Sequence, residues 1–266
     1  MANTLEYPNY KMGGESSKNQ IETDLAVNNN SGDLMGPVEV VNLEASDVGT
    51  DVKIDSILMV AVHPYRNLVK AAFDKLLALS LLIFLLPLML IVWFIVRSDG
   101  GPAIFAHRRI GLNGKPFYCL KYRTMVMDSE RVLAEILSTN AAARNEWNLT
   151  HKLKHDTRVT KIGRFLRRSS LDELPQLINV LRGEMSLVGP RPITIEEVPK
   201  YGEAINYYYL CRPGITGLWQ VSGRNDVSYN QRVRMDAFYA RKLSFRLDVG
   251  ILILTIKSVV LGKGAS

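Results

Sequence analysis

The feature that most constrains this chain is an apolar tract between Lys75 and Arg97. Its 21 residues, Leu76 to Val96, are interrupted only by Ser80 and Pro87. A helix of this length is long enough to cross the hydrocarbon core of a bilayer. A soluble core helix would normally show a polar face, and this tract has none. The sequence therefore predicts a membrane-associated protein.

The way the tract meets the membrane depends on Pro87 and on the flanking charges. Proline removes a backbone hydrogen bond and clashes with the preceding turn, so the helix must bend near its middle. Basic residues stand on both sides: Arg66, Lys70, Lys75, Arg97, Arg108 and Arg109. The positive-inside rule would place both ends on the cytoplasmic side. A helix that enters the bilayer and returns to the same side satisfies both observations. A kinked helix that spans the bilayer once is permitted too, and these features do not decide between the two arrangements.

Charge is distributed unevenly along the 266 residues. Residues 1–57 hold ten acids and three bases, whereas residues 58–266 hold thirty bases and sixteen acids. We expect residues 1–60 to be an acidic, mostly disordered tail, and the absence of a basic start with an apolar stretch indicates no secretory signal peptide. The basic remainder favours anionic lipid, phosphorylated substrates or nucleic acid as partners. Two cysteines are too few for a disulfide framework.

The rest of the chain predicts a mainly α domain with one small β-hairpin. Residues 103–110 and 116–122 are β-prone and flank Asn113-Gly114, a strong hairpin signal. Helices are expected over residues 128–146, 162–168, 171–182, 194–210, 228–241 and 248–261. The last is too short to span a bilayer and is expected to be amphipathic, packed on the domain or lying in the membrane interface.

Two adjacent acids, Asp172 and Glu173, follow a basic run that ends at Arg168. One interpretation makes Ser170 a helix N-cap, Glu173 its capping-box partner and Asp172 a first-turn acid. The other is chemical: a carboxylate beside arginines can attack a phosphate that they bind, or hold a metal against it. The two interpretations are compatible.

Several loops combine basic side chains with residues that open or bend the backbone. They are Arg109-Ile-Gly111, Lys121-Tyr-Arg123-Thr124, Arg167-Arg168-Ser-Ser, Gly189-Pro-Arg191-Pro and Arg212-Pro-Gly214. Arginine forks suit phosphate oxygens, so the set predicts a polyanionic ligand such as a nucleoside diphosphate, with a divalent cation shared between phosphate and carboxylate. His151 and His155 have metal-ligand spacing but lie among lysines, which favours a surface or phosphate-facing role over zinc binding.

Ordered motifs along about three quarters of the chain carry a family resemblance. They are Lys70-x-x-x-Asp74, Gly101-Pro102, Arg109-Ile-Gly-Leu-Asn-Gly114, Lys121-Tyr-Arg-Thr-Met125, Gly163 to Gln176, Met185 to Pro192, and Arg212-Pro-Gly-Ile-Thr-Gly217. Together they resemble the bacterial sugar transferase family, the monotopic phosphoglycosyl transferases that act on polyprenol phosphates. Two positions depart from the family pattern: Thr157 replaces a proline in Asp-Pro-Arg, and His107 replaces a glutamine.

The resemblance implies a two-step transfer of sugar 1-phosphate from a UDP-sugar to undecaprenyl phosphate, with release of UMP. Asp172 matches the nucleophile that forms the aspartyl intermediate, and Glu173 matches its acidic partner. Both are expected to hold Mg²⁺. Arg167 and Arg191 match phosphate-binding positions, and Lys121, Arg123 and Arg212 are further candidates for substrate binding.

The resemblance also implies a topology and a set of partners. Residues 66–97 would form a re-entrant membrane helix broken at Pro87, and residues 98–266 a catalytic domain on the cytoplasmic face of the bacterial inner membrane. The polar N-terminal tail resembles the short members that initiate exopolysaccharide synthesis, with UDP-galactose or UDP-glucose as donor. Downstream glycosyltransferases are expected partners, and a homodimer is left open. A non-catalytic membrane adaptor is the rival hypothesis, and nucleic-acid binding is not expected because no recognition motif is present.

Overall fold

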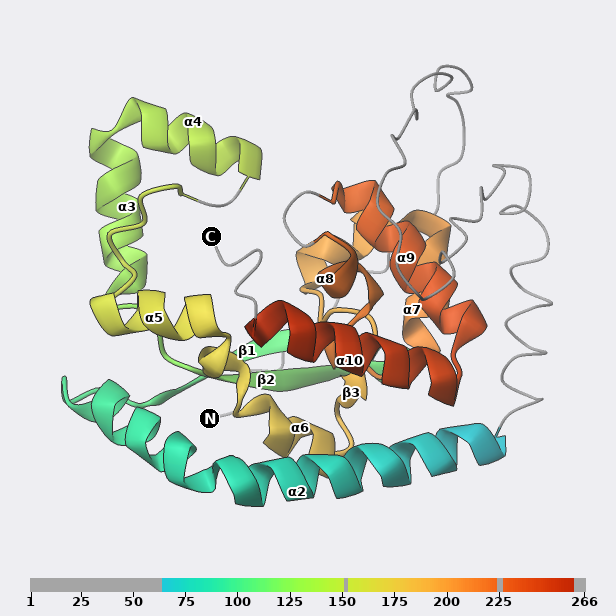
Figure 1. Ribbon diagram of the computed structural model, residues 1–266. Helices are drawn as coiled ribbons and strands as arrows, with labels where there is room; N and C mark the ends of the chain where they lie inside the picture. Colours follow the sequence, from blue (N-terminus) through green and yellow to red (C-terminus); the bar gives the residue numbers. More distant parts are fainter. Residues whose placement is uncertain (1–63, 151–152, 224–226, 261–266) are drawn as a thin grey trace, which may run out of the picture. The chain divides into compact units, whose positions relative to one another are not determined.

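The computed structural model describes residues 64–150, 153–223 and 227–260 (Figure 1). The predicted tail, residues 1–60, lies outside the described residues, and so does His151. The described residues all belong to one compact unit, Glu44–Ser266. Among the described residues helices predominate, accompanied by two small two-stranded sheets. This agrees with the predicted class, a mainly α domain with a β-hairpin.

The apolar tract forms part of a long helix, α2 (Pro64–Arg97). Pro87 lies inside it and the helix continues through the proline, bending along its length (Figure 1). The expected break at Pro87 is therefore wrong for this structure. Both sides of the proline are held on the same domain: Ala78 is buried in the largest core cluster, and the Tyr122 hydroxyl donates to the Met89 carbonyl over 2.7 Å. These contacts keep the two halves aligned although one backbone hydrogen bond is lost.

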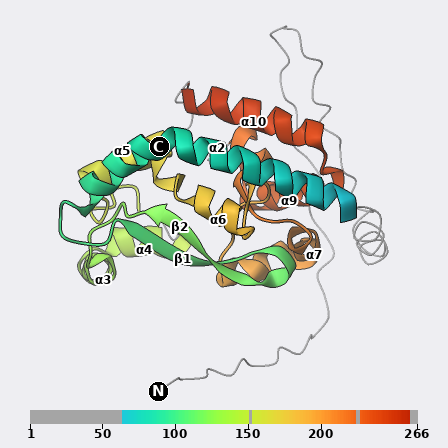
Figure 2. The ribbon, with the colours of Figure 1, turned by 90° about the horizontal axis from the view of Figure 1, so that it is seen from below.

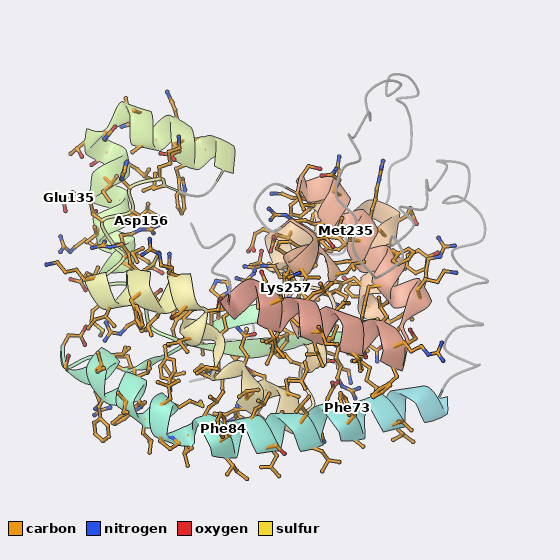
Figure 3. All side chains as sticks on the ribbon, viewed as in Figure 1. Phe73, Phe84, Glu135, Asp156, Met235 and Lys257 are labelled. Atoms are coloured by element: carbon orange, nitrogen blue, oxygen red, sulfur yellow. The ribbon has the colours of Figure 1, made fainter. Side chains whose placement is uncertain are left out.

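Much of α2 exposes apolar side chains. Of its most apolar 18-residue window, 17% is buried, and Phe84 is 80% exposed. Figure 3 shows side chains projecting from α2 away from the rest of the ribbon. A buried core helix would hide these groups, so the exposed apolar face favours membrane association.

The predicted hairpin is confirmed. Strands β1 (Ile104–Ile110) and β2 (Pro116–Tyr122) pair antiparallel, with Ile104 opposite Tyr122 and Ile110 opposite Pro116. A short 3₁₀ turn, η2 (Leu112–Gly114), joins them. Asn113 adopts a left-handed conformation there, with φ of 57°, which asparagine tolerates better than most residues.

The remaining elements follow in chain order. They are α3 (Ser129–Thr139), α4 (Ala141–Thr150), α5 (Lys161–Ser169), η3 (Leu171–Glu173), α6 (Gln176–Arg182), β3 (Ser186–Val188), η4 (Ile195–Ala204), α7 (Ile205–Tyr209), β4 (Gly214–Thr216), α8 (Leu218–Ser222), α9 (Tyr229–Lys242) and α10 (Phe245–Val260). Three expected helices are divided: residues 128–146 at Asn140, 171–182 before α6, and 194–210 into η4 and α7. The parallel pair β3–β4 was not predicted.

The hairpin, α6 and the final helices surround the main core. Figure 2 shows α6 lying between α2 and the hairpin. Leu177 and Val180 of α6 pack with Ala78 of α2 in the core cluster that also includes Ile251 of α10. While Ile251 is buried, Ile253 and Ile256 are exposed, so α10 rests on the domain by one side and presents apolar groups on another. This is compatible with the expected position at the membrane interface.

Candidate active site

The acid pair lies in the short turn between α5 and α6. Ser170 ends α5 with φ of 56°, the left-handed conformation of a helix C-cap, and its backbone N–H donates to the Arg167 carbonyl over 3.3 Å. Asp172 and Glu173 then fall in the 3₁₀ turn η3, and Pro175 precedes α6. The capping-box interpretation is wrong, because an N-cap needs extended backbone and the Ser170 side chain makes no capping hydrogen bond.

Asp172 is a buried carboxylate, only 9% exposed. Burial raises its pKa to about 6, and the neighbouring Glu173 carboxylate acts in the same direction. Lys121 and Arg167 oppose the shift. At pH 7 to 8 most Asp172 side chains are therefore ionised, while water has limited access to them. That combination suits a nucleophile.

Glu173 forms an ion pair with Lys121 of β2. The Lys121 Nζ lies 2.6 Å from the Glu173 Oε1. Burial acts to raise the pKa of Glu173, but Lys121 and Arg191 outweigh it and hold that pKa below its usual value. The structure thus brings Lys121 and Arg191 to the acid pair, as predicted from the sequence. The two acids differ in their pKa values: that of Glu173 is lowered and that of Asp172 is raised.

Arg167 reaches the site from the last turn of α5. Its Nε donates to the Thr124 hydroxyl over 2.9 Å, and its charge lowers the pKa of Asp172. The start of α5 also lies against the backbone of Thr124. The Thr160 N–H donates to the Thr124 carbonyl, and a Cβ atom added to Gly163 would lie 2.0 Å from the same carbonyl oxygen. Glycine at position 163 therefore lets α5 approach the end of β2, which places Arg167 near the acids. Thr124 was not singled out as a site residue, although it belongs to a quoted motif.

Arg191 extends from the Gly-Pro-Arg-Pro turn after β3. It lies over the Trp219 ring at 5.7 Å from the centroid, and Arg232 lies over the same ring at 4.6 Å. Arg109 is close enough to Arg191 that the two charges interact, and burial together with Arg191 lowers the pKa of Arg109. The site therefore carries more positive charge than the predicted residues alone.

Arg123 is held by hydrogen bonds at the C-terminal end of α2. Its guanidinium donates to both carboxylate oxygens of Asp99 and to the carbonyls of Val96, Pro102 and Met125. These five hydrogen bonds occupy all its N–H donors. Arg123 fixes the C-terminal end of α2 through these contacts, and its predicted role in substrate binding stays a prediction.

Arg212 is also away from the acid pair. Its Nε donates to the Gly183 carbonyl over 2.9 Å, at the C-terminal end of α6, whereas the acids precede the N-terminal end of that helix. At 1.5 Å per residue, ten residues of helix-like chain separate Glu173 from Gly183 by roughly 15 Å. The predicted role of Arg212 in binding substrate at the acid pair is therefore not supported.

Neither of the two departures from the family pattern lies in the acid pair itself. Asp156 and Arg158, on either side of Thr157, form an ion pair at 2.7 Å, and Arg158 lies over the Trp147 ring. These contacts hold the loop without a proline. His107 lies on β1, where its ring contacts Phe105 at a centroid distance of 5.8 Å.

Carboxylates are the candidate metal ligands. In residues 64–150, 153–223 and 227–260, no group of three or more His, Cys, Asp or Glu side chains forms a metal site. His155 is exposed. Asp172 and Glu173 still fit Mg²⁺, which is commonly held by one or two carboxylates plus substrate phosphates and water.

A match to a family model shows which protein family this chain belongs to. The model for bacterial sugar transferases matches residues 65–262, which include the acid pair and every basic residue described around it. The chain belongs to the bacterial sugar transferase family. Its predicted resemblance is thereby confirmed.

Individual members of the family are closely similar to this chain. It is 50% identical over 196 residues to an undecaprenyl-phosphate galactose phosphotransferase of Salmonella typhimurium, covering 74% of this chain and 41% of that protein. It is 50% identical over 206 residues to the exopolysaccharide production protein ExoY of Sinorhizobium fredii, covering 77% and 91%. A UDP-glucose:undecaprenyl-phosphate glucose-1-phosphate transferase of Xanthomonas campestris is 37% identical over 251 residues, covering 91% and 46%. The chain thus spans less than half of the galactose and glucose relatives.

Proposed function

We propose that this chain transfers a sugar 1-phosphate from a UDP-sugar to undecaprenyl phosphate and releases UMP. The observation that carries the proposal is Asp172, a buried carboxylate with a pKa of about 6 beside Glu173 and near Lys121 and Arg167. The names of the relatives from Salmonella and Xanthomonas describe transfers onto this lipid, which supports the same general reaction here.

In the first step, an ionised Asp172 oxygen attacks the phosphorus that bears the sugar. A phosphorus–oxygen bond forms, the bond to the uridine-side phosphate breaks, and UMP leaves with the electron pair. The phosphosugar remains on Asp172 as an acyl phosphate. Arg167, Arg191 and Lys121 neutralise phosphate charge, which is the main requirement for such a displacement.

In the second step, a phosphate oxygen of undecaprenyl phosphate attacks the same phosphorus. The acyl phosphate bond breaks, Asp172 returns to its carboxylate form, and the product is a sugar linked to the lipid through a diphosphate. Asp172 and Glu173 would together hold Mg²⁺, which supplies further neutralisation of phosphate charge. Burial of Asp172 limits hydrolysis of the intermediate.

The membrane arrangement follows from α2 and its flanks. We propose that both ends of α2 lie on the cytoplasmic face of the inner membrane, because basic residues flank both ends of its apolar tract, and that the bent but continuous helix inserts its exposed apolar face into the bilayer. The acid pair would then be accessible to a soluble nucleotide sugar and to a lipid phosphate. UDP-galactose and UDP-glucose are the proposed donors, and the proposed role is the first step of exopolysaccharide repeat-unit synthesis.

The test is UMP release by the full chain in detergent or vesicles, with a panel of UDP-sugars, undecaprenyl phosphate and Mg²⁺. We expect UMP with UDP-galactose or UDP-glucose, a covalent phosphosugar on Asp172 when lipid is omitted, and none of either with Asp172→Asn. Glu135→Gln, an exposed acid on α3, is the matched control. Absence of UMP with every UDP-sugar contradicts the proposal. Retention of function in Asp172→Asn would support the adaptor hypothesis instead.

A further inference from the structure

An apolar groove lies between the membrane helix and α5. It is open to the outside, has a volume of about 300 Å³ and is lined by Val92 and Ile95 of α2 and by Lys161, Ile162, Phe165 and Leu166 of α5. Figures 1 and 2 both show α5 beside α2. The cavity is at the small end of the volume range of ligand pockets.

The walls of the groove are formed by apolar side chains that are exposed at the surface of the described residues. Ile95, Ile162 and Phe165 are 44%, 40% and 62% exposed, whereas Val92 and Leu166 are buried and form the floor. Lys161 is the only lining residue with a charge, and its aliphatic stem can lie along apolar surface while its ammonium group stays in a polar environment. A hydrophobic occupant would fill this groove, and a polar one would not.

The two sides of α5 have different roles. Gly163 and Arg167, one helical turn apart, face Thr124 at the end of β2. Ile162, Phe165 and Leu166 face the groove at the spacing of one helix face. The same short helix therefore holds a phosphate-binding arginine near Asp172 and an open apolar surface beside the membrane helix.

The groove is also continuous with the packing around the acid pair. Its floor residues Leu166 and Val92 belong to a core cluster against which Leu171 and Leu174 pack, and these two leucines flank Asp172 and Glu173 in sequence. Arg167 and Arg168 occupy the last turn of α5, the end nearest the acids. An amphiphile with its phosphate at this end would place its apolar chain along α5.

We infer that the groove holds the first isoprenoid units of the polyprenyl phosphate acceptor while its phosphate approaches Asp172. This inference rests on the proposed function and adds where the acceptor chain binds. The occupant must combine a negatively charged head with a hydrocarbon chain, because arginines stand at one end of α5 and apolar side chains line its groove face. Binding in the groove would align the lipid phosphate for the second step.

The kinetic test fills the groove and measures the two steps separately. We expect Ile95→Trp to raise the KM for undecaprenyl phosphate about ten-fold, because a side chain occupying the groove displaces one apolar group of the lipid. UMP release from the UDP-sugar alone, which needs no acceptor, reports on the fold and the first step. Ile83→Trp is the matched control, since Ile83 is exposed on the same helix outside the groove.

The binding test does not depend on activity. A polyprenyl phosphate with a photoreactive group on its first isoprenoid units should label the α5 segment containing Ile162 and Phe165, and Ile95→Trp should reduce that labelling. Excess phosphatidylglycerol should not compete.

The outcomes separate the two proposals. Normal UMP release together with an unchanged acceptor KM in Ile95→Trp overturns the groove inference alone. Labelling that ordinary phospholipid abolishes overturns it in favour of a general lipid contact. No UMP with any donor contradicts the proposed function, while the labelling still decides whether the groove binds the polyprenyl chain.

Discussion

Replacing Asp172 by asparagine is expected to abolish activity and to stabilise the fold. The carboxyl group is 9% exposed, and its pKa is raised to about 6 from 3.8 mainly by burial. Folding therefore removes a charged group from water without fully compensating it. Asparagine keeps a similar shape but carries no charge, so the variant avoids this energetic cost.

The size of the effect follows from the shift in pKa. About 2 pKa units at about 1.4 kcal/mol each correspond to about 3 kcal/mol. A raised carboxyl pKa means that the folded state binds the proton more tightly than the unfolded state. This contribution is fully present below pH 4 and is lost as the pH rises towards 6. The stability gain of Asp172→Asn should therefore be near zero at pH 4 and about 3 kcal/mol at pH 8.

Thermal unfolding, followed by tryptophan fluorescence in detergent across this pH range, measures the gain. For a domain of this size the expected rise in Tm at pH 8 is roughly 6–12 °C. Asp99→Asn provides a control of opposite sign, because hydrogen bonds from Arg123 lower the pKa of Asp99 to about 2. That variant should lose stability above pH 4. If the Tm of Asp172→Asn follows the unsubstituted protein at every pH, Asp172 is not desolvated and the reasoning is refuted.

Three other substitutions test how the site is held. Lys121→Met removes a cation that lowers the pKa of Asp172 and Glu173, so the acidic limb of UMP release against pH should move to higher pH; Lys115→Met, on the exposed hairpin turn, should leave it in place. Arg123→Gln should lower the free energy of unfolding by about 2–4 kcal/mol, because hydrogen bonds are lost, and UMP release per folded molecule should be retained. A selective rise in the KM for UDP-sugar would show instead that Arg123 binds substrate. Gly163→Ala should cost about 2 kcal/mol and reduce UMP release, because its Cβ meets the Thr124 carbonyl. Gly250→Ala, with open space around it, should instead gain about 0.5–1 kcal/mol in denaturant unfolding; equal effects of the two alanines would contradict the close approach of α5 to β2.

Local patterns predicted the elements well where a single local signal is strong. The Asn113-Gly114 pair located the hairpin, and the apolar tract located α2. Predictions failed where an expected helix is divided, in one case by the extended backbone of Asn140 and in another by the 3₁₀ turn η3 before α6. The pair β3–β4 could not be found locally, because each strand has three residues and its pairing joins distant parts of the chain.

For the candidate site, the sequence predicted which residues take part more successfully than it predicted where they lie. The sequence singled out Asp172, Glu173, Lys121, Arg167 and Arg191, and the structure brings these five together. It predicted the same role for Arg123 and Arg212, since each arginine lies in one of the motifs that carry the family resemblance. Their hydrogen bonds to the ends of α2 and α6 depend on segments that are distant in sequence, and no local pattern reveals them.

The sequence by itself determined that the chain has an apolar helix long enough to cross a membrane, a basic domain and an adjacent pair of acids, because composition and order are properties of the sequence. Only the tertiary structure decided what the environment of each acid is. Asp172 has a raised pKa because packing removes water from it, whereas Glu173 is kept ionised because β2 and the turn after β3 bring Lys121 and Arg191 close. Desolvation and electrostatic interaction depend on distances through space, and those distances are set by folding.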